Sequence, residues 1–222
     1  YACGDQIEGI PIVHFSSPGF GHCDAGFRKV ASRLLALGLF ILASPVLLLA
    51  TLIVRLDGQG SALFIQNRFG CGGRMFRMYK FRTMCRDAES RLQELRRFNE
   101  ADGALFKMKR DPRVTPIGRF LRKTSIDELP QLINILRGEM RLVGPRPLPV
   151  SDLEGYQGSW HFMRQLCPPG ITCIWQVSGR SGIGFEDMCL LDVWYLLNRD
   201  WILDARILFR TAWVVVFGHG AY

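Results

Sequence analysis

The sequence predicts an α+β protein: a mostly helical small domain with a short β-hairpin, anchored by a proline-kinked re-entrant membrane helix and by interfacial amphipathic helices. Two observations lead to this class. Residues 34–54 are an uncharged apolar run that a proline interrupts, whereas the remaining chain mixes short alternating segments with helix-like ones. With 222 residues, of which 48% are hydrophobic and 22% charged, the chain has enough apolar side chains for one packed domain plus an appendage. This composition excludes a wholly disordered chain.

Three segments are expected along the chain. Residues 1–26 are rich in glycine, proline and serine, which predicts an irregular N-terminal leader. Residues 27–57 are expected to form the re-entrant membrane helix. Residues 58–222 are expected to form a domain on the cytoplasmic face of the membrane, ending in a C-terminal interfacial helix.

The apolar run is long enough to cross a bilayer, but two features oppose crossing. As a straight helix its 21 residues would extend roughly 31 Å. Ser44-Pro45 lies in the middle, which predicts a kink, and the Ser44 hydroxyl is the nearest group to bind the freed backbone. Basic residues flank the run on both sides: Arg28, Lys29, Arg33 and Arg55. Since basic flanks resist translocation, we favour a re-entrant helix over a spanning one, and a spanning helix over a buried core helix.

Four further elements are expected beyond the run. Residues 61–83 alternate around a Gly-Cys-Gly-Gly turn, which is typical of a β-hairpin. Residues 86–100 predict a polar surface helix, and residues 129–136 a short apolar helix closed by Gly138. Residues 201–217 interleave charges with bulky apolar side chains, which fits either core packing or a helix in the membrane interface.

The charge and the cysteine content narrow the class of partner. A net charge of +8 favours phosphorylated molecules, anionic lipids or nucleic acid. Between Lys107 and Arg146 there are ten basic and four acidic residues, so most of the excess charge lies in this segment. The seven cysteines form no C-x-x-C pair, which excludes a disulfide scaffold or zinc ribbon and predicts reduced thiols. The four histidines lack ligand spacing, which argues against a histidine-built metal site.

Two adjacent carboxylates, Asp127 and Glu128, stand just before Pro130 in this basic segment. Proline prefers the first turn of a helix, so the pair is expected at a helix N-terminus. One interpretation is structural: acidic residues complement the helix dipole, and Ser125 with Glu128 matches a capping box. The other is chemical: one carboxylate is a nucleophile kept ionised by nearby arginines, and its neighbour binds a divalent cation. The pattern alone favours the structural interpretation.

Two further motifs carry cations. In Gly-Pro-Arg-Pro the prolines stiffen the backbone around Arg146, which reduces the entropy lost on binding phosphate, although a plain proline-rich turn explains the motif as well. In Tyr-Lys-Phe-Arg-Thr-Met, Lys80 and Arg82 share one face of the predicted strand. Two half-buried cations are costly without an anion to meet, unless the strand simply lies at the surface.

Three motifs thus follow a proline-broken apolar helix in order: YKFRTM, DPRVTPIGRFLRKTSIDELPQLINILRGEMRLVGPRPL and PPGITCIWQVSGRS. In this combination the sequence resembles the bacterial sugar transferase family from about residue 27 to the C-terminus, and most closely the monotopic, exopolysaccharide-priming members. The resemblance implies a membrane-bound enzyme that moves hexose-1-phosphate (galactose or glucose) from a UDP-sugar to undecaprenyl phosphate and releases UMP. It also implies a covalent aspartyl-phosphosugar intermediate.

The resemblance implies roles for individual residues. Asp127 corresponds to the family's nucleophile and Glu128 to its partner carboxylate, and Mg²⁺ is expected to bind at this pair. The remaining positions are expected at the substrate phosphates (Lys80, Arg82, Arg122, Arg146), at the nucleotide-sugar pocket (Gln176, Arg180) and at the break of the membrane helix (Ser44, Pro45). The chain departs from the family pattern at Cys173, where glycine is usual, and at residues 198–200.

The implied location is the cytoplasmic face of the bacterial inner membrane, in contact with lipid and without a nucleic-acid partner; a homodimer is compatible with the resemblance. An N-acetylated amino sugar is an alternative donor. A different class remains as an alternative: a membrane-anchored basic protein that binds nucleic acid or anionic lipid. That class predicts salt-dependent DNA binding and no dependence on Asp127.

Overall fold

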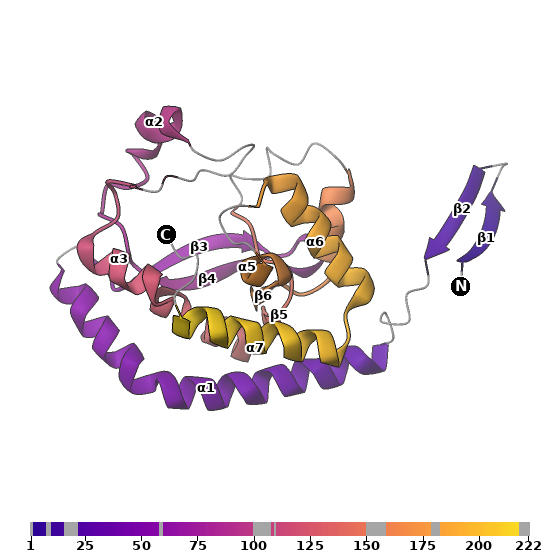
Figure 1. The fold of residues 1–222 in the computed structure, drawn as a ribbon, viewed down its shortest axis with the longest axis horizontal. Helices are drawn as coiled ribbons and strands as arrows, with labels where there is room; N and C mark the ends of the chain where they lie inside the picture. Colours follow the sequence, from indigo (N-terminus) through magenta and orange to yellow (C-terminus); the bar gives the residue numbers. More distant parts are fainter. Residues whose placement is uncertain are drawn as a thin grey trace.

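The computed structural model describes residues 2–7, 10–15, 22–57, 60–99, 108, 110–149, 159–178 and 183–217 of the chain. These residues form a mixed α and β structure with short strands and one long apolar helix near the N-terminus, as the sequence predicts. Figure 1 shows this helix running along one side of the domain, with the hairpin and the other helices above it. The helices are α1 (His22–Leu56), α2 (Leu92–Leu95), α3 (Pro116–Lys123), α4 (Gln131–Arg137), α5 (Ile174–Ser178), α6 (Phe185–Asn198) and α7 (Trp201–Phe217).

The N-terminal segment differs from the predicted irregular leader. β1 (Ala2–Ile7) and β2 (Ile10–Phe15) pair as an antiparallel hairpin, and α1 begins at His22 instead of residue 27. The Ile-Pro-Ile-Val-His-Phe sequence of β2 is rich in β-branched residues, which favour strands, and this preference outweighs Gly4 and Pro11, which lie inside the two strands. The glycine and proline content of the leader was therefore a misleading signal.

α1 is one continuous helical segment that contains Pro45, and in Figure 1 it is bent along its length. Proline has no N–H, so residue 45 cannot bond the carbonyl of Ile41 one turn earlier. The Ser44 hydroxyl donates to that same carbonyl, at 2.7 Å from Oγ to O. The expected partner for the freed backbone group is therefore confirmed.

Both ends of α1 pack against the same domain. In its N-terminal half, Ala36 is fully buried in the main core, to which α4, β5, α6 and α7 also contribute. Near its end, Ala50 and Val54 join a second cluster with the hairpin and α3. Between these contacts α1 exposes leucines and isoleucines, and only 11% of its most apolar window is buried. By length and composition this helix is able to cross a membrane, yet it lies along the base of the domain.

The strands and short helices of the domain follow the sequence pattern. β3 (Leu63–Phe69) and β4 (Met75–Phe81) form the predicted hairpin around glycines with positive φ. α4 is confirmed, and Gly138 ends it in the left-handed conformation. β5 (Arg141–Val143) pairs in parallel with β6 (Gly170–Thr172).

The surface helix predicted for residues 86–100 is much shorter. Its α-helical part is α2, followed by a 3-10 turn at Arg96–Phe98. Before α2, the Ser90 hydroxyl donates to the carbonyl of Asp87, at 2.8 Å. Such local side-chain bonds compete with helix formation, which explains why this polar segment starts with turns.

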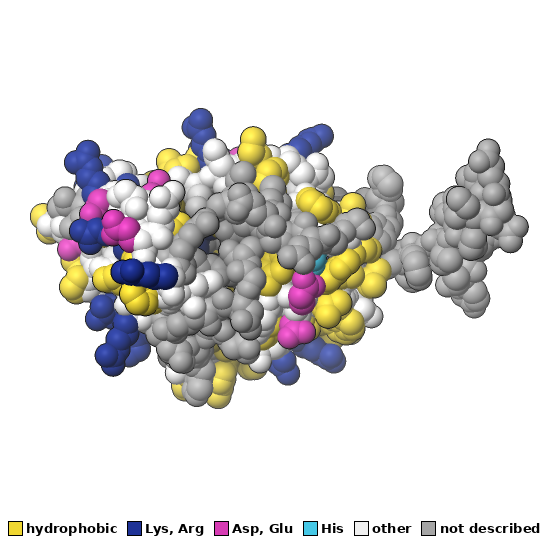
Figure 2. Space-filling view, turned by 90° about the horizontal axis from the view of Figure 1, so that it is seen from above, with side chains coloured by type: hydrophobic (Ala, Val, Ile, Leu, Met, Phe, Trp, Pro, Cys, Tyr) yellow, Lys and Arg dark blue, Asp and Glu magenta, His cyan; other side chains and the backbone are white. Residues whose placement is uncertain are grey.

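α7 matches the predicted helix at 201–217 and exposes a row of large apolar side chains beside α1. Ile202, Phe209 and Trp213 are all more than half exposed, whereas Ile207 is buried. The face of the molecule away from α1 instead carries Lys, Arg, Asp and Glu side chains around its rim (Figure 2). Apolar side chains lie between these charged ones on the same face, so the two kinds of side chain are interspersed there.

Gly118 is the tightest packing point close to the candidate site, and we expect Gly118→Ala to destabilise the fold. A Cβ there would lie 2.0 Å from the carbonyl oxygen of Thr83, so the backbone has to shift. Overpacking of this kind costs about 1–3 kcal/mol or more in the free energy of unfolding. Chemical denaturation measures it, with Gly38→Ala as the control because no atom lies within 4 Å of a Cβ at Gly38. Equal stability of the two variants would contradict the packing described here.

Candidate active site

The carboxylate pair lies on a single 3-10 turn, Ile126–Glu128, directly before Pro130 and α4. Ser125 precedes the turn with φ 57°, the only positive φ of a non-glycine residue among the described residues. A serine held in this region is strained, and such strain is concentrated at functional sites. The Ser125 side chain makes no capping hydrogen bond, so the capping-box interpretation is wrong. The backbone turn, and not a cap, presents the two carboxylates.

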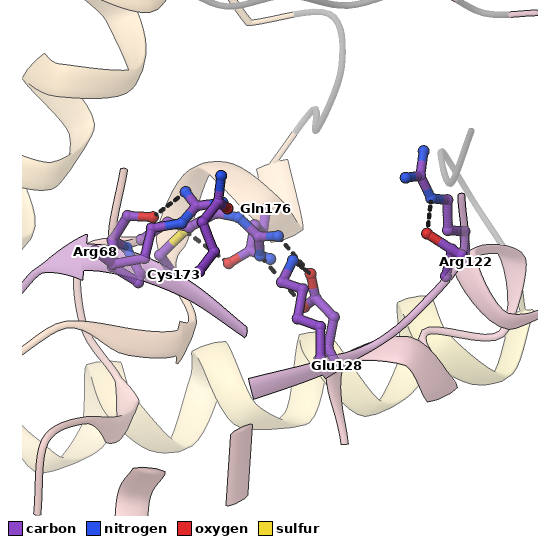
Figure 3. Close-up of polar contacts among 10 residues, drawn as sticks. Arg68, Arg122, Glu128, Cys173 and Gln176 are labelled. Atoms are coloured by element: carbon purple, nitrogen blue, oxygen red, sulfur yellow. Dashed lines mark hydrogen bonds and ion pairs between the residues drawn. The ribbon is translucent and has the colours of Figure 1, made fainter. Parts of the chain in front are cut away.

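Glu128 is held between two cations from distant parts of the chain. Lys80 of β4 places its Nζ 3.0 Å from Oε1, and Arg146 of the Gly-Pro-Arg-Pro loop bonds both carboxylate oxygens, with Nη1 3.3 Å from Oε2. The side chains of all three are about one-fifth exposed. Figure 3 shows Glu128 with dashed lines that mark its polar contacts. The anion that the strand cation Lys80 was expected to need is thus supplied by the protein itself.

Asp127 lies beside this cluster but outside its ion pairs. Its side chain is buried, with 8% exposed, and none of the described residues gives it a hydrogen bond or an ion pair. Burial first, and then the charge of Glu128, raise the pKa of Asp127 to about 6, against the opposing effect of Lys80, Arg122 and Arg146. Asp127 is therefore a carboxylate with unused lone pairs.

The two carboxyl groups have opposite electrostatic environments. Burial acts to raise the pKa of Glu128, but Arg146 and Lys80 outweigh it and hold this pKa far below its usual range. The same contact holds the pKa of Arg146 above its usual range, although burial alone acts to lower it. Burial lowers the pKa of Lys80 despite Glu128. Glu128 therefore stays ionised as a structural counter-ion, whereas Asp127 is the group whose charge is easily changed.

Of the two other cations predicted to bind phosphate, Arg122 lies near the Asp127–Glu128 carboxylate pair and Arg82 does not. Arg122 of α3 donates from Nε to the Thr83 hydroxyl, at 2.9 Å, and its charge acts on Asp127. In Figure 3 it lies on the opposite side of Glu128 from Arg68. Arg82 instead donates to the carbonyl of Ser61, at 2.9 Å, and holds the segment before the hairpin. The structure thus brings Lys80, Arg122 and Arg146 around the pair and leaves Arg82 out.

The predicted nucleotide-sugar residues are only partly described. Gln176 lies on α5, on the same side of Glu128 as Arg68 in Figure 3, and the Cys173 thiol donates to its Oε1 at 3.0 Å. Burial raises the pKa of the Cys173 thiol well above its usual value, so it stays protonated. Arg180 lies outside the described residues. The Ser44-Pro45 break lies in α1, at the base of the domain.

Three polar residues near the site were missed by sequence reasoning. Arg68 of β3 donates to the carbonyl of Pro147, at 2.9 Å. Arg164 and Asp192 form a buried ion pair behind Arg146. Arg68 stands alone among the apolar and amide residues of its strand, which was a weak signal. The other two are 28 residues apart, and no local pattern connects them.

The side chains of the site could bind a magnesium ion only if the substrate supplied further oxygen ligands. Among the described residues, no three His, Cys, Asp or Glu side chains are grouped to hold a metal. Mg²⁺ commonly uses one or two carboxylates and completes its shell with substrate phosphates and water. The unengaged carboxylate of Asp127, next to Glu128, fits that kind of site.

The fold and the site define a class of protein: a membrane-associated α+β domain that sets a buried carboxylate pair among cations, as suits phosphorylated substrates. Comparison with known proteins identifies the family. The chain matches the bacterial sugar transferase family over residues 24–218, and it therefore belongs to this family.

Three relatives illustrate the match. The chain is 46% identical over 223 residues to the galactosyl transferase CpsE of Streptococcus agalactiae, covering 97% of this chain and 48% of that protein. It is 43% identical to the undecaprenyl-phosphate galactose phosphotransferase of Salmonella typhimurium, over 83% of this chain and 39% of that protein. It is 39% identical to the exopolysaccharide production protein ExoY of Rhizobium meliloti, over 82% of each chain. The chain thus spans about half or less of the first two relatives.

Proposed function

We propose that the protein transfers hexose-1-phosphate, from UDP-galactose or UDP-glucose, to undecaprenyl phosphate and releases UMP, as the first step of exopolysaccharide synthesis. One observation carries the proposal: Glu128 is neutralised by Lys80 and Arg146, while the adjacent Asp127 is buried and unpaired among the described residues. A carboxylate in that state is a suitable nucleophile for phosphorus. The family and the names of the relatives support the choice of donor and acceptor.

The reaction proceeds in two displacements at one phosphorus atom. An oxygen of the Asp127 carboxylate attacks the phosphorus that bears the sugar, and the bond from that phosphorus to the UMP oxygen breaks. A phosphate oxygen of undecaprenyl phosphate then attacks the same phosphorus, and Asp127 leaves as a carboxylate. Neither step requires a proton to be moved, which suits a site whose described side chains are carboxylates and cations.

The cations perform the stabilising part of this chemistry. Phosphoryl transfer depends on charge neutralisation and positioning more than on acid–base work. The charges of Arg122 and Arg146 both act on Asp127, so both side chains are close enough to the carboxylate pair to bind phosphate oxygens of the donor. Asp127 and Glu128 are the residues that would hold a Mg²⁺ ion, which would supply further positive charge to neutralise the phosphates of the donor.

Release of UMP tests the function directly. The full chain in nanodiscs is given a panel of UDP-sugars with polyprenyl phosphate, and we expect UMP to form with UDP-galactose or UDP-glucose. If UMP forms preferentially with a UDP-N-acetylhexosamine, the proposed reaction stands but the proposed sugar is wrong. If no UDP-sugar yields UMP while the chain binds DNA in a salt-dependent way, the proposal is overturned in favour of a basic binding protein.

We also propose that α1 is re-entrant, kinked at Ser44-Pro45, so that its N-terminal side and the catalytic domain share the cytoplasmic face of the inner membrane. Contacts at the start of α1 support this. Arg28 pairs with Asp204 of α7, at 3.2 Å, and the Ser32 hydroxyl accepts from the backbone N–H of Leu142, at 2.9 Å. A helix that crossed the bilayer would have to give up these contacts with the domain. The exposed apolar side chains of α1 and α7 then enter the same leaflet.

Cysteine labelling of intact spheroplasts measures this topology. We expect a unique cysteine at Ser16 to be protected from an impermeant reagent added outside. Ser44→Ala with Pro45→Ala restores a straight apolar helix and should expose that cysteine in part of the population. Thr51→Ala is the matched control, because its hydroxyl bonds a carbonyl of α1 in the same way but no proline is involved. External labelling of the parent chain would make α1 an ordinary spanning helix.

The raised pKa of Asp127 predicts an acid limit to the activity. The nucleophile must be ionised, and burial raises its pKa to about 6. UMP release should therefore be constant above neutral pH and fall about tenfold for each pH unit below about 6. Rates measured from pH 5 to 8, at saturating donor and with unfolding monitored in parallel, check the limit. A flat profile down to pH 5 would contradict the assignment of Asp127.

A further inference from the structure

The loop that carries Arg146 is anchored in an unusual way. Pro145 and Pro147 have no N–H, so at these two positions the backbone of the loop can be held only through the carbonyl oxygens. Three successive carbonyls are in fact bound, each by a different element. The N–H of Gly170 in β6 donates to Pro145 at 2.9 Å, and Arg68 of β3 donates to Pro147 at 2.9 Å.

The middle carbonyl, that of Arg146 itself, is bound by a buried arginine. Arg164 lies on the 3-10 helix Ser159–Leu166, and its Nη2 is 3.0 Å from this oxygen. The same nitrogen forms an ion pair with Asp192 of α6. The Arg164 and Asp192 side chains are 2% and 1% exposed. One guanidinium thus connects α6 to the backbone of the residue whose side chain binds Glu128.

Packing alone does not fix this part of the loop. A cavity of about 20 Å³, room for about one water, is lined by Arg146, Arg164 and both flanking prolines. A buried ion pair is also an expensive way to fill space, since apolar side chains of the same size are often equally stabilising. Stability alone therefore does not explain the Arg164–Asp192 ion pair. Its hydrogen bond to the Arg146 carbonyl indicates a second role, which is to hold the loop.

We propose that Arg164 and Asp192 are positioning residues for Arg146: together they hold its backbone carbonyl so that its guanidinium faces Glu128 and the donor phosphates. This inference rests on the proposed function for its effect on the reaction, but the effect on the loop is independent of it. Without the pair, the Arg146 carbonyl loses its bond and the loop can shift into the adjacent cavity.

The test replaces both members with apolar residues of similar size, Arg164→Met with Asp192→Leu. Such a replacement leaves no uncompensated buried charge, so the chain should still fold. We expect kcat/KM for the UDP-sugar to fall 10- to 100-fold. In an Arg146→Lys background, the same double replacement should lower kcat/KM less than threefold. Residue 146, which the ion pair positions, is already altered in that background. If the double variant does not fold, Arg164→Lys makes the same comparison, since it keeps the charge and shortens the reach.

Hydrogen exchange of the peptide covering residues 144–149 supplies a readout that does not depend on catalysis. We expect faster exchange there in the pair variant, and no change there when Asp111 is replaced by Asn. Asp111 and Arg113 form a similarly buried ion pair, 8% and 6% exposed, and the hydrogen bonds of the Arg113 side chain to described residues reach Asp111 and Ala88 and not the loop. Equal losses of activity in both Arg146 backgrounds, or unchanged exchange, would overturn the proposal. If the parent chain releases no UMP, the proposed function fails and exchange alone decides the positioning role.

Discussion

Asp127→Asn is expected to abolish turnover, with a loss of at least about 10³-fold in UMP release. An amide oxygen is a far weaker nucleophile than a carboxylate, and no other carboxylate takes its place because Glu128 is engaged by Lys80 and Arg146. Without lipid acceptor, the parent chain should release UMP in near-stoichiometric amount as the phosphosugar intermediate forms. The variant should show no such burst.

The same substitution is expected to leave the fold intact or make it more stable. The pKa of Asp127 is raised to about 6 in the folded chain, above the value of about 3.9 for an unfolded Asp. Above pH 6 the ionised side chain therefore destabilises the folded state, by on the order of 1–3 kcal/mol, and asparagine removes that cost. An inactive but more stable variant separates a catalytic role from a structural one.

Two controls complete the experiment. Asp87→Asn removes an exposed carboxylate from a surface pair with Arg91 and should change neither UMP release nor stability. Mass spectrometry of the parent chain after incubation with donor should show a phosphosugar on the peptide that contains Asp127. Strictly sequential kinetics, with a required ternary complex and no trapped phosphosugar, would refute the nucleophile assignment.

Glu128→Gln is expected to impair both stability and activity. Glutamine leaves Lys80 and Arg146 close together without their shared counter-ion, which should cost about 3 kcal/mol in the free energy of unfolding. Arg146 then loses its anchor, so UMP release should fall about 10²-fold or more. Losing the Mg²⁺ ligand proposed here acts in the same direction.

The pH profile of Glu128→Gln gives a sharper readout than its rate. The charge of Glu128 raises the pKa of Asp127, so its removal should move the acid limit of the residual activity to lower pH. Glu186→Gln is the matched control, because Glu186 is 60% exposed and, among the residues that the structure describes, forms an ion pair with His161 alone. An unchanged acid limit would mean that Asp127 and Glu128 are not electrostatically coupled.

Local features were determined by the sequence alone. The glycine-rich turn fixed the hairpin of β3 and β4, Gly138 ended α4, and the proline in α1 left free the carbonyl that Ser44 binds. Each depends on residues within about four positions of one another, where backbone geometry leaves few alternatives. The motifs were likewise sufficient for the family, and the chain belongs to it.

The assembly of the site was decided by the tertiary structure. Glu128 meets Lys80, 48 residues before it, and Arg146, 18 residues after it, and only the packing of β4 against the turn and the loop creates that contact. The strand pattern placed Lys80 and Arg82 together, yet Arg82 binds Ser61 and Arg68 takes a place near the loop. The two carboxylates looked equivalent in the sequence. They differ because Asp127 is buried with no ion pair to any described residue, whereas the cations compensate Glu128, and burial depends on every element that surrounds them.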